Sequence, residues 1–572
     1  MHNLYLRLAP WFLTLAELLL LTAAGGLILI SSRNPSARPE TPAFLSVERA
    51  FARLARRQRL SIALVGLSVI AIRVGLIPIL GIPQPGSHDE FSYLLAADTF
   101  AHGHITNPTH PMWIHFETFH VIQRPTYMSM YPPAQGLVLA AGQLLGHPWI
   151  GQVLATALMC SALCWMLQGW LPSAWALLGA ILAVLRLGLL SYWMNGYWAA
   201  SIAALGGALV LGAWPRLRKH LRVSDSLLMG LGVVILANSR PYEGLIFSLP
   251  FVAAMLWWLA GKQHPLFKIS FSRTLLPLFL VLACGALATG CYNRQVTGSP
   301  FRMAYQVNRA TYAAAPYFLW QKALPEPAYH HEVMRMLYLS ERTDFEKNFT
   351  VEGFLGYAAQ KAVSWWRFYL GPLLTLPALV LPWVVRQREM RLPFAICGAM
   401  IASFAVQSWT LPHYFSPAVG VLYLLLVEGM RHVWHSPFMT RRIGSALTGP
   451  ALVRAIPVLA CAMILLRLTA VAASVQIESA WPRGNLARFE IKRQLSQIPG
   501  EQLVLVTYGP HHNFDREWVW NDAEIDRSRV VWARDMGRDA NQELLNYFKD
   551  RRVWRVNADA SPPRLESYEA PR

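Results

Sequence analysis

The chain has 572 residues, of which 54% are hydrophobic, and its mean hydropathy is +0.31. This composition excludes a chain of ordinary soluble domains and predicts an integral membrane protein. The formal net charge is +19, but residues 476–572 carry 15 acidic and 15 basic side chains. The basic excess therefore lies in the membrane part, where it signals orientation rather than nucleic-acid binding.

Apolar stretches of spanning or nearly spanning length recur along residues 1–475, the expected membrane domain. Because lipid cannot satisfy open backbone groups, and the stretches do not alternate, each should be a helix. The first, residues 11–30, lacks a strongly basic start and a clear cleavage site, which predicts a retained helix. The sequence thus predicts a polytopic α-helical membrane protein with about twelve spans. The stretches are residues 11–30, 61–82, 148–170, 173–190, 196–213, 222–238, 244–260, 274–291, 367–386, 393–409, 414–430 and 455–474.

Basic loops predict the sidedness of the chain. Residues 31–60 carry seven arginines, and so short an Arg-rich loop belongs on the cytoplasmic side. Residues 83–131, 292–365 and 476–572 then lie outside, provided that residues 132–147 form a helix that does not cross. The other basic loops that agree with this threading are 215–222, 261–268, 386–391 and 431–442. Any chemistry is expected on the outer face.

The C-terminal residues 476–572 change in composition and read as a small soluble α/β domain. Residues 502–508, 529–536 and 553–557 are expected strands, and residues 541–551 an expected helix. Neither a glycine-rich phosphate loop nor a dinucleotide fingerprint occurs in this sequence.

Two adjacent carboxylates follow the second span in the motif "SHDEFSYLLA". Ser87 and Glu90 have the spacing of a capping box, in which the two side chains satisfy the first backbone amides of a helix. The capping box explains Glu90 as a structural residue, but it does not explain Asp89. Both residues therefore remain candidate catalytic acids.

The helix that begins at these acids has an apolar face. Phe91, Leu94, Leu95 and Phe100 recur at helical spacing. The pattern predicts a juxtamembrane amphipathic helix that lies in the membrane interface, with Asp89 at its start.

The first outer loop is rich in histidine, with six between residues 88 and 120. His115, Glu117 and His120 could collect on one side of a short helix and hold a divalent metal. Solvated or substrate-contacting histidines are the alternative interpretation. No cofactor is certain from the sequence, and a divalent metal is possible.

Polar residues at the outer ends of spans are candidates for holding an anionic lipid donor. Arg240 and Glu243, in "NSRPYEG", are either a snorkelling arginine with its partner or a phosphate site, since the forked guanidinium donors suit phosphate. The full candidate set is Arg124, Tyr131, Gln135, Arg240, Glu243, Arg302, Tyr305, His413 and Tyr414.

The pattern resembles the GT-C superfamily of integral-membrane glycosyltransferases, which includes the protein O-mannosyltransferases and the aminoarabinose transferases. The features that carry the resemblance are "HDEFSYLLA", the "YPPAQG" helix start, the late "HYFSP" and the C-terminal outer domain. Only the Asp-Glu loop is a specific motif. The sequence departs from the pattern in its extra first helix, and "MYPP" replaces the lysine-bearing "EKPP" of the aminoarabinose transferases.

The resemblance implies a glycosyltransferase that moves a sugar from a polyprenyl-phosphate donor to an acceptor hydroxyl, with inversion, outside a bacterial inner membrane. Asp89 would be the general base, because the attacking hydroxyl must lose a proton. The expected partners are membrane lipid, the polyprenyl-phosphate sugar and an acceptor glycan, lipid or protein, and no nucleic acid.

Other classes of function stay open. A flippase or transporter of lipid-linked sugars would also have many spans, but its polar residues usually gather near the bilayer midplane. A non-catalytic membrane partner or a polysaccharide polymerase or ligase is a further alternative.

Overall fold

The computed structural model describes residues 2–32, 42–261, 271–436, 448–475, 477 and 484–568. Parts of three expected basic loops lie outside the described residues, at 33–41, 262–268 and 437–442.

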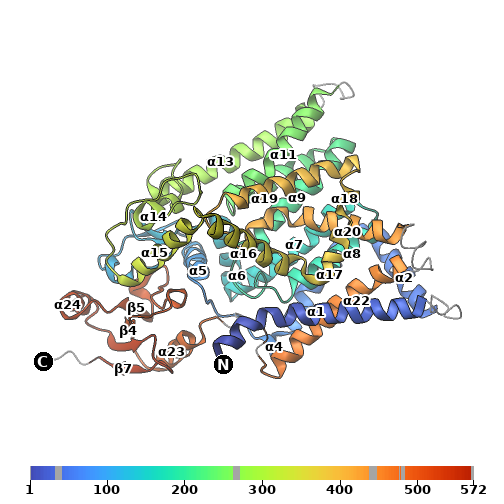
Figure 1. Ribbon diagram of the computed structural model, residues 1–572. Coiled ribbons are helices and arrows are strands. Elements are labelled where there is room, and N and C mark those ends of the chain that lie inside the picture. The colour runs from blue at the N-terminus through green and yellow to red at the C-terminus, as the bar shows by residue number, and fades with distance from the viewer. Residues whose placement is uncertain are drawn as a thin grey trace.

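Helices form the body of the molecule, as Figure 1 shows. Their first half comprises α1 (His2–Ser32), α2 (Pro42–Arg56), α3 (Gln58–Gly75), α4 (Ile77–Leu80), α5 (His88–Ala101), α6 (Pro133–Leu144), α7 (Pro148–Trp170), α8 (Ser173–Ala183), η2 (Val184–Gly188), α9 (Ala200–His220) and α10 (Val223–Ala237). The second half comprises α11 (Pro241–Ala260), η3 (Phe271–Leu275), α13 (Leu276–Thr297), α14 (Ala304–Tyr312), α15 (Glu332–Lys347), α16 (Val351–Tyr369), α17 (Gly371–Ala378), α18 (Leu381–Val384), η4 (Arg388–Met390), α19 (Arg391–Ala405), η5 (Pro412–Ala418), α20 (Val419–His435) and α22 (Thr448–Ala472).

The chain is a polytopic α-helical membrane protein. Among the described residues, 8 helices are long and apolar enough to cross a membrane, or up to 9 if the bent pair α16 and α17–α18 is one span. All twelve apolar stretches are largely helical. Three of them, in α8–η2, α10 and α19, form helices that are shorter than a membrane span.

The segment on which the predicted sidedness depended is α6. A helix of 12 residues is roughly 18 Å long, well short of the ~30 Å apolar thickness of a bilayer. Figure 1 shows α6 beside α5, and the N-terminal end of α1 lies at the same end of the bundle as the C-terminal sheet, with α2 at the opposite end.

The core of the bundle is built around α7, α9 and α20. In the most apolar part of the η5–α20 segment, 94% of the residues are buried, compared with 6% in α1. Small residues let these helices approach closely, and a Cβ added at Gly207 would collide with the backbone oxygen of Pro417. The central helices therefore form a fixed framework, whereas α1 lies against its surface.

Two small sheets lie at one end of the bundle. Within residues 83–131, β1 (Asn107–Pro108), β3 (Thr126–Ser129) and β2 (Val121–Ile122) pair antiparallel in that order beside η1 (Trp113–Phe116). The C-terminal sheet has the order β5-β4-β6-β7, with β4 parallel to both neighbours and β7 antiparallel to β6. Its elements are α23 (Leu486–Gln497), β4 (Gln502–Thr507), η6 (Phe514–Arg516), η7 (Ile525–Arg527), β5 (Val530–Arg534), α24 (Arg538–Tyr547), β6 (Arg552–Asn557) and β7 (Leu565–Ser567).

The C-terminal sheet shares a core with the outer loops. Alternate residues of β4 face opposite sides, so Leu503 and Leu505 pack toward α5, η1 and α15, whereas Val504 and Val506 pack toward α23. Phe91 of α5 stacks on Trp520 with ring centroids 4.9 Å apart. The apolar face of α5, expected to meet lipid headgroups, therefore packs against protein.

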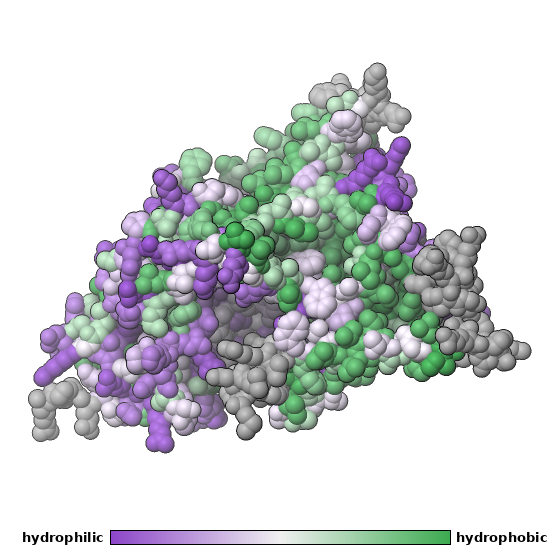
Figure 2. Space-filling model, in the orientation of Figure 1, coloured by the Kyte–Doolittle hydropathy of each residue, from purple (hydrophilic) through white to green (hydrophobic). Residues whose placement is uncertain are grey.

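Hydrophilic residues gather over this sheet-bearing end, and hydrophobic residues cover the helices, as Figure 2 shows for one face. This division is the one expected of a membrane body with a water-exposed cap.

Candidate active site

The first turn of α5 places the two predicted acids in different surroundings. Ser87 is the N-cap residue, and the capping box with Glu90 is present. The Glu90 carboxylate accepts hydrogen bonds from the backbone N–H groups of Gly86 at 2.9 Å, Ser87 at 3.1 Å and Tyr197 at 3.0 Å. Glu90 therefore joins the start of α5 to the segment that precedes α9, and we assign it a structural role.

Asp89 faces a group of polar rings. The Tyr131 hydroxyl donates to Asp89 Oδ1, and His120 Nδ1 lies 3.1 Å from the same oxygen. His88 Nε2 lies 3.5 Å from Asp89 Oδ2. The four residues come from α5, the turn before β2 and the segment before α6, so the fold of the first outer loop assembles them.

This environment keeps Asp89 ionised. Burial alone would raise its pKa, but the charges of His120 and His88 and the hydrogen bonds from His120 and Tyr131 outweigh burial and hold the pKa well below its usual range. Burial, followed by the charge of Asp89, raises the pKa of Tyr131 well above its ordinary value, so its phenol keeps the proton that it donates. Burial lowers the pKa of His88 to about 4.

The backbone of His120 is held in an uncommon conformation. Its φ is 56°, in the left-handed region that non-glycine residues rarely adopt. Its carbonyl accepts from the Ser92 hydroxyl at 2.7 Å and from the Met130 amide at 3.0 Å. Backbone strain maintained by surrounding bonds is typical of functional positions and here directs the imidazole toward Asp89.

His88, Asp89 and His120 could also hold a metal ion. Their ligand atoms lie within 4.8 Å of one another, and two imidazoles with a carboxylate are a donor set that Zn²⁺ accepts. His88 Nδ1 is buried and has no hydrogen-bond partner among the described residues. The residues thus fit a divalent cation.

The metal site predicted from His115, Glu117 and His120 is corrected by the structure. His115 Nδ1 lies 3.2 Å from the Arg534 carbonyl oxygen. The Glu117 carboxylate accepts from the Tyr312 hydroxyl at 2.7 Å and lies 2.9 Å from His330 Nδ1. Only His120 of the predicted set belongs to the group of potential ligands found among the described residues. Assuming a single helix over residues 115–120 caused the error, because η1 ends at Phe116 and the chain then turns toward β2.

A cationic and aromatic patch adjoins the Asp89 group. The Arg240 guanidinium lies over the Tyr414 ring at 4.5 Å, and its field acts on Tyr93 and Tyr414. Tyr93 stacks on Tyr131 with ring centroids 4.4 Å apart. Arg240 Nε is buried and has no hydrogen-bond partner among the described residues. An anion could therefore occupy this patch beside Tyr131.

His413 lies on the other side of this patch. Its Nδ1 is 3.1 Å from the Tyr192 hydroxyl, and its ring is 4.7 Å from that of Trp198. Tyr192 and Trp198 were not foreseen from sequence. The signal was present in the run "SYWMNGYW" between two spans, where polar aromatic residues concentrate.

Two further donor candidates have other tasks or positions. Gln135 is fully buried and donates to the Gln152 side chain at 2.7 Å and the Tyr197 carbonyl at 2.9 Å, so it positions the segment before α9. Arg124 is exposed and lies over the Trp113 ring at 4.5 Å.

The remaining candidates lie around the lipid-facing side of the site. Arg302 is exposed, whereas Glu243 is buried in the first turn of α11. Tyr305 and Tyr131 line the same small pocket, together with Asn238.

An apolar groove of about 1100 Å³ lies along α10, α11 and α13. It shares Asn238, Thr289, Asn293 and Met303 with the small pocket that Tyr131 lines. The apolar groove therefore adjoins the small pocket that is lined by Tyr131, the residue that donates to Asp89.

The C-terminal sheet contributes to this region as well. The Tyr127 hydroxyl donates to the Asn521 carbonyl at 3.1 Å, and the Ala523 amide donates to the Asp98 carboxylate at 2.7 Å. Partial burial and the charge of Asp89 raise the pKa of Asp515, on η6. Sequence inspection missed Asp515, because its proximity to Asp89 depends on a contact across more than 400 residues.

Comparisons with solved structures find similar folds. The crystal structure of ArnT from Cupriavidus metallidurans in the apo state is 14% identical over 86% of this chain and 92% of that chain, with a TM-score of 0.47. The same protein bound to undecaprenyl phosphate is 13% identical over the same shares, with a TM-score of 0.49. The oligosaccharyltransferase AglB from Archaeoglobus fulgidus, in complex with an inhibitory peptide and a dolichol-phosphate, is 11% identical over 86% of this chain and 69% of that chain, with a TM-score of 0.45.

No family model and no curated protein sequence matches the chain.

Proposed function

We propose that the protein is a glycosyltransferase that uses a polyprenyl-phosphate sugar as donor and transfers the sugar to an acceptor hydroxyl at the extracytoplasmic face. The observation that carries the proposal is the placement of an ionised, enclosed carboxylate beside an arginine and a lipid-facing groove. Asp89 supplies the carboxylate, and Arg240 supplies the cation.

Asp89 is the general base in this proposal. The acceptor hydroxyl loses its proton as it attacks the anomeric carbon, and a positioned carboxylate accepts it. The lowered pKa makes Asp89 a weak base, which suits a reaction in which proton loss is late and the leaving group is good. Tyr131 and His120 fix the orientation of the carboxylate. A single displacement of this kind inverts the anomeric configuration.

Arg240 stabilises the leaving lipid phosphate. The negative charge that develops on the bridging oxygen needs a cation already in place, and a guanidinium can offer two donors to one phosphate. Its buried Nε without a partner gives Arg240 unused donor capacity. Tyr414 and His413 border the same space.

The apolar groove along α10, α11 and α13 accommodates the polyprenyl chain. A prenyl chain partitions into an apolar surface. This groove lies between the candidate spans α11 and α13 and the shorter apolar helix α10, and it shares lining residues with the Tyr131 pocket. The site and the C-terminal residues 484–568 occupy one end of the bundle. The arginine-rich residues 31–60 support an extracytoplasmic position for this end.

A divalent cation at His88, Asp89 and His120 is a second possibility, supported by the unpartnered His88 Nδ1. Such an ion would supply a positive charge near the donor phosphate. The ion would also bind the Asp89 carboxylate, and a metal-bound carboxylate cannot act as a free general base. The two roles of Asp89 therefore exclude each other. Exhaustive chelation separates them: unchanged activity supports Asp89 as a free base, and loss of activity restored by a single divalent metal assigns it as a ligand.

The experiment that tests the proposal begins with mass spectrometry of cell-envelope lipids and glycoproteins with and without the gene. The missing conjugate identifies the sugar and its acceptor. Purified wild-type protein and the Asp89→Asn variant are then assayed with the matching polyprenyl-phosphate sugar. Asp344→Asn is the matched control, because Asp344 is an exposed carboxylate on α15.

Transfer by the wild type and by Asp344→Asn, but not by Asp89→Asn, would support the proposal. Wild-type rates in Asp89→Asn would exclude Asp89 as the base. Movement of lipid-linked sugar across vesicles without a new glycosidic bond would instead show a transporter.

A further inference from the structure

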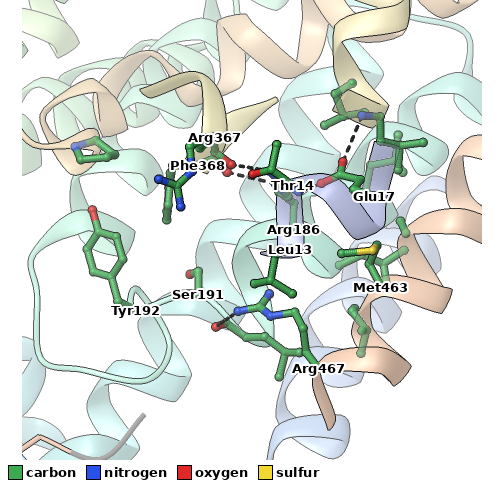
Figure 3. A pocket seen from close by; sticks show the side chains of 18 of the residues that line it. Leu13, Thr14, Glu17, Arg186, Ser191, Tyr192, Arg367, Phe368, Met463 and Arg467 are labelled. Atoms are coloured by element: carbon green, nitrogen blue, oxygen red, sulfur yellow. Dashed lines mark hydrogen bonds and ion pairs between the residues drawn. The ribbon is translucent and has the colours of Figure 1, made fainter. Parts of the chain in front are cut away.

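A second cavity, of about 460 Å³, lies between the extra N-terminal helix and the bundle. It is lined by residues of α1, α8, η2, α16, α17, η5 and α22 and by the segment that leads from η2 toward α9. Its charged lining residues are three arginines, Arg186, Arg367 and Arg467, and one acid, Glu17. Figure 3 shows the three arginines reaching this space from different elements.

Arg186 is held mainly by the protein itself. It donates to the Phe368 carbonyl at 3.0 Å and to the Arg367 carbonyl at 2.5 Å, and it pairs with Glu17 at 3.4 Å. Glu17 is 5% exposed and also accepts from the Leu373 amide at 3.0 Å. Through these contacts Glu17 links α1 to Arg186 and to the start of α17. Glu17 is the only carboxylate among the described residues that line the cavity.

The other two guanidinium groups add positive charge to the same space. Arg467 donates to the Leu190 carbonyl at 2.9 Å. Arg367 lies over the Trp11 ring at 5.1 Å, and its Nε is buried and has no hydrogen-bond partner among the described residues. Charged residues among membrane-spanning helices are costly and usually mark a function. The unpartnered Nε of Arg367, with the Arg467 guanidinium lining the same cavity, favours an anionic ligand.

We propose that this cavity binds the phosphate of a membrane lipid, with the phosphate between Arg367 and Arg467 and the acyl or prenyl chain along α1. The guanidinium donors match phosphate oxygens, and apolar residues such as Leu13, Leu182 and Met463 line the rest of the space. Because nearly all of residues 11–30 of α1 are at least partly exposed on the surface of the bundle, a lipid can enter from the bilayer beside them.

The cavity borders the candidate active site without coinciding with it. Tyr192 lines the cavity and lies 3.1 Å from His413 through its hydroxyl. The segment from Ser191 ends at Tyr197, whose backbone amide donates a hydrogen bond to the Glu90 carboxylate. The phosphate can belong to a substrate lipid that approaches the site from this side or to an ordinary phospholipid, and both present the same chemistry to the arginines.

Native mass spectrometry of the purified full chain tests the proposal, with dioleoyl phosphatidic acid as the probe and dioleoylglycerol as the phosphate-free control. The double variant Arg367→Gln/Arg467→Gln should retain phosphatidic acid at least tenfold more weakly than the wild type. Arg335→Gln, which removes an exposed arginine of α15, should retain it unchanged.

A second variant guards against loss of folding in the arginine double variant. Ala460→Trp fills the cavity that Ala460 lines and keeps every charge. It should reduce phosphatidic acid retention to a similar degree. Retention at the wild-type level in both the double variant and Ala460→Trp would overturn the proposal, as would equal retention of dioleoylglycerol.

Competition with a polyprenyl phosphate identifies the source of the ligand. At least tenfold preference for the polyprenyl phosphate would assign the cavity to a substrate lipid, and equal affinity would assign it to bulk phospholipid. Both results support the phosphate site. The binding readout requires no transfer reaction, so it stands or fails separately from the proposed glycosyltransferase.

Discussion

Charged groups are satisfied differently in the helix bundle and in the outer region around Asp89. In the bundle, Arg186, Arg216 and Arg467 donate to backbone carbonyls. Around Asp89, the partners are the titratable or exchangeable side chains of His88, His120 and Tyr131. Backbone carbonyls cannot accept or release a proton at ordinary pH, so these bonds hold the bundle framework, whereas the group around Asp89 is equipped for proton transfer.

Replacing Asp89 gives the largest expected effect. In Asp89→Asn the base is lost while the side chain keeps its shape, so transfer should fall by roughly 10³-fold or more. Rates measured with a polyprenyl-phosphate sugar, at equal amounts of folded protein, check this expectation. A fall smaller than tenfold would remove the distinction drawn between the outer group and the bundle.

Glu90→Gln tests whether the neighbouring acid belongs to the framework. Glutamine has one acceptor oxygen, so the backbone amides of Gly86, Ser87 and Tyr197 cannot all keep their partner, at a cost of about 3 kcal/mol of folding stability. We expect a lower thermal midpoint and less folded protein, with transfer per folded molecule reduced far less than in Asp89→Asn. An unchanged midpoint together with abolished transfer would make Glu90 a catalytic residue instead.

The outer region should also lose stability in mild acid, through His331. Burial and then the charge of Arg534 lower its pKa to about 3, and its Nε2 donates to the Ile114 carbonyl at 2.7 Å. Glu117, His330 and His115 also surround it. Because the unfolded chain takes up this proton near pH 6.5 and the folded chain does not, stability is present above pH 6.5 and falls as the pH drops toward 3.

The matching variant is His331→Gln, whose side-chain amide reaches the position of the imidazole Nε2, so that it keeps a donor near the Ile114 carbonyl but cannot be protonated. The drop in thermal midpoint between pH 7.5 and pH 5 should be smaller in the variant, by the equivalent of at most about 2 kcal/mol. Scanning fluorimetry of purified protein measures both slopes. Equal slopes would show that His331 is accessible to protons in the folded state.

Tyr131→Phe should have the smallest effect. It removes the hydroxyl that orients Asp89 and keeps the ring that stacks on Tyr93. His120 still contacts the carboxylate, so we expect transfer to fall by about tenfold, the equivalent of one hydrogen bond. Steady-state rates at saturating donor check this, and a loss as large as that of Asp89→Asn would make Tyr131 part of the reacting group.

Local patterns in the sequence predicted several of these features correctly. The S-x-x-E spacing predicted the capping box at Ser87, because a helix start depends on residues three positions apart. The Pro-Pro pair at residues 132–133 marked the start of a helix, and α6 begins at Pro133. The strands β4, β5 and β6 lie where alternation and β-branched residues placed them.

Contacts between residues far apart in the sequence could not be predicted from local sequence patterns. The apolar face of α5 was assigned to lipid, because Phe91 and Leu95 have the same hydrophobicity whether they meet acyl chains or Trp520. The assignment of Glu117 to a metal failed for a related reason, since its partners Tyr312 and His330 lie about 200 residues further along the chain.

The sequence by itself determined the class of the protein and the position of its acids: hydrophobic length requires membrane helices, and the motif puts Asp89 at a helix start after a span. Only the tertiary structure decided which neighbours act on those acids. His120 and Tyr131 reach Asp89 through a folded loop, and Glu17 meets Arg186 across 169 residues. Electrostatic and hydrogen-bond energies fall steeply with distance, so the chemistry of a residue depends on atoms a few ångströms away rather than on its neighbours in sequence.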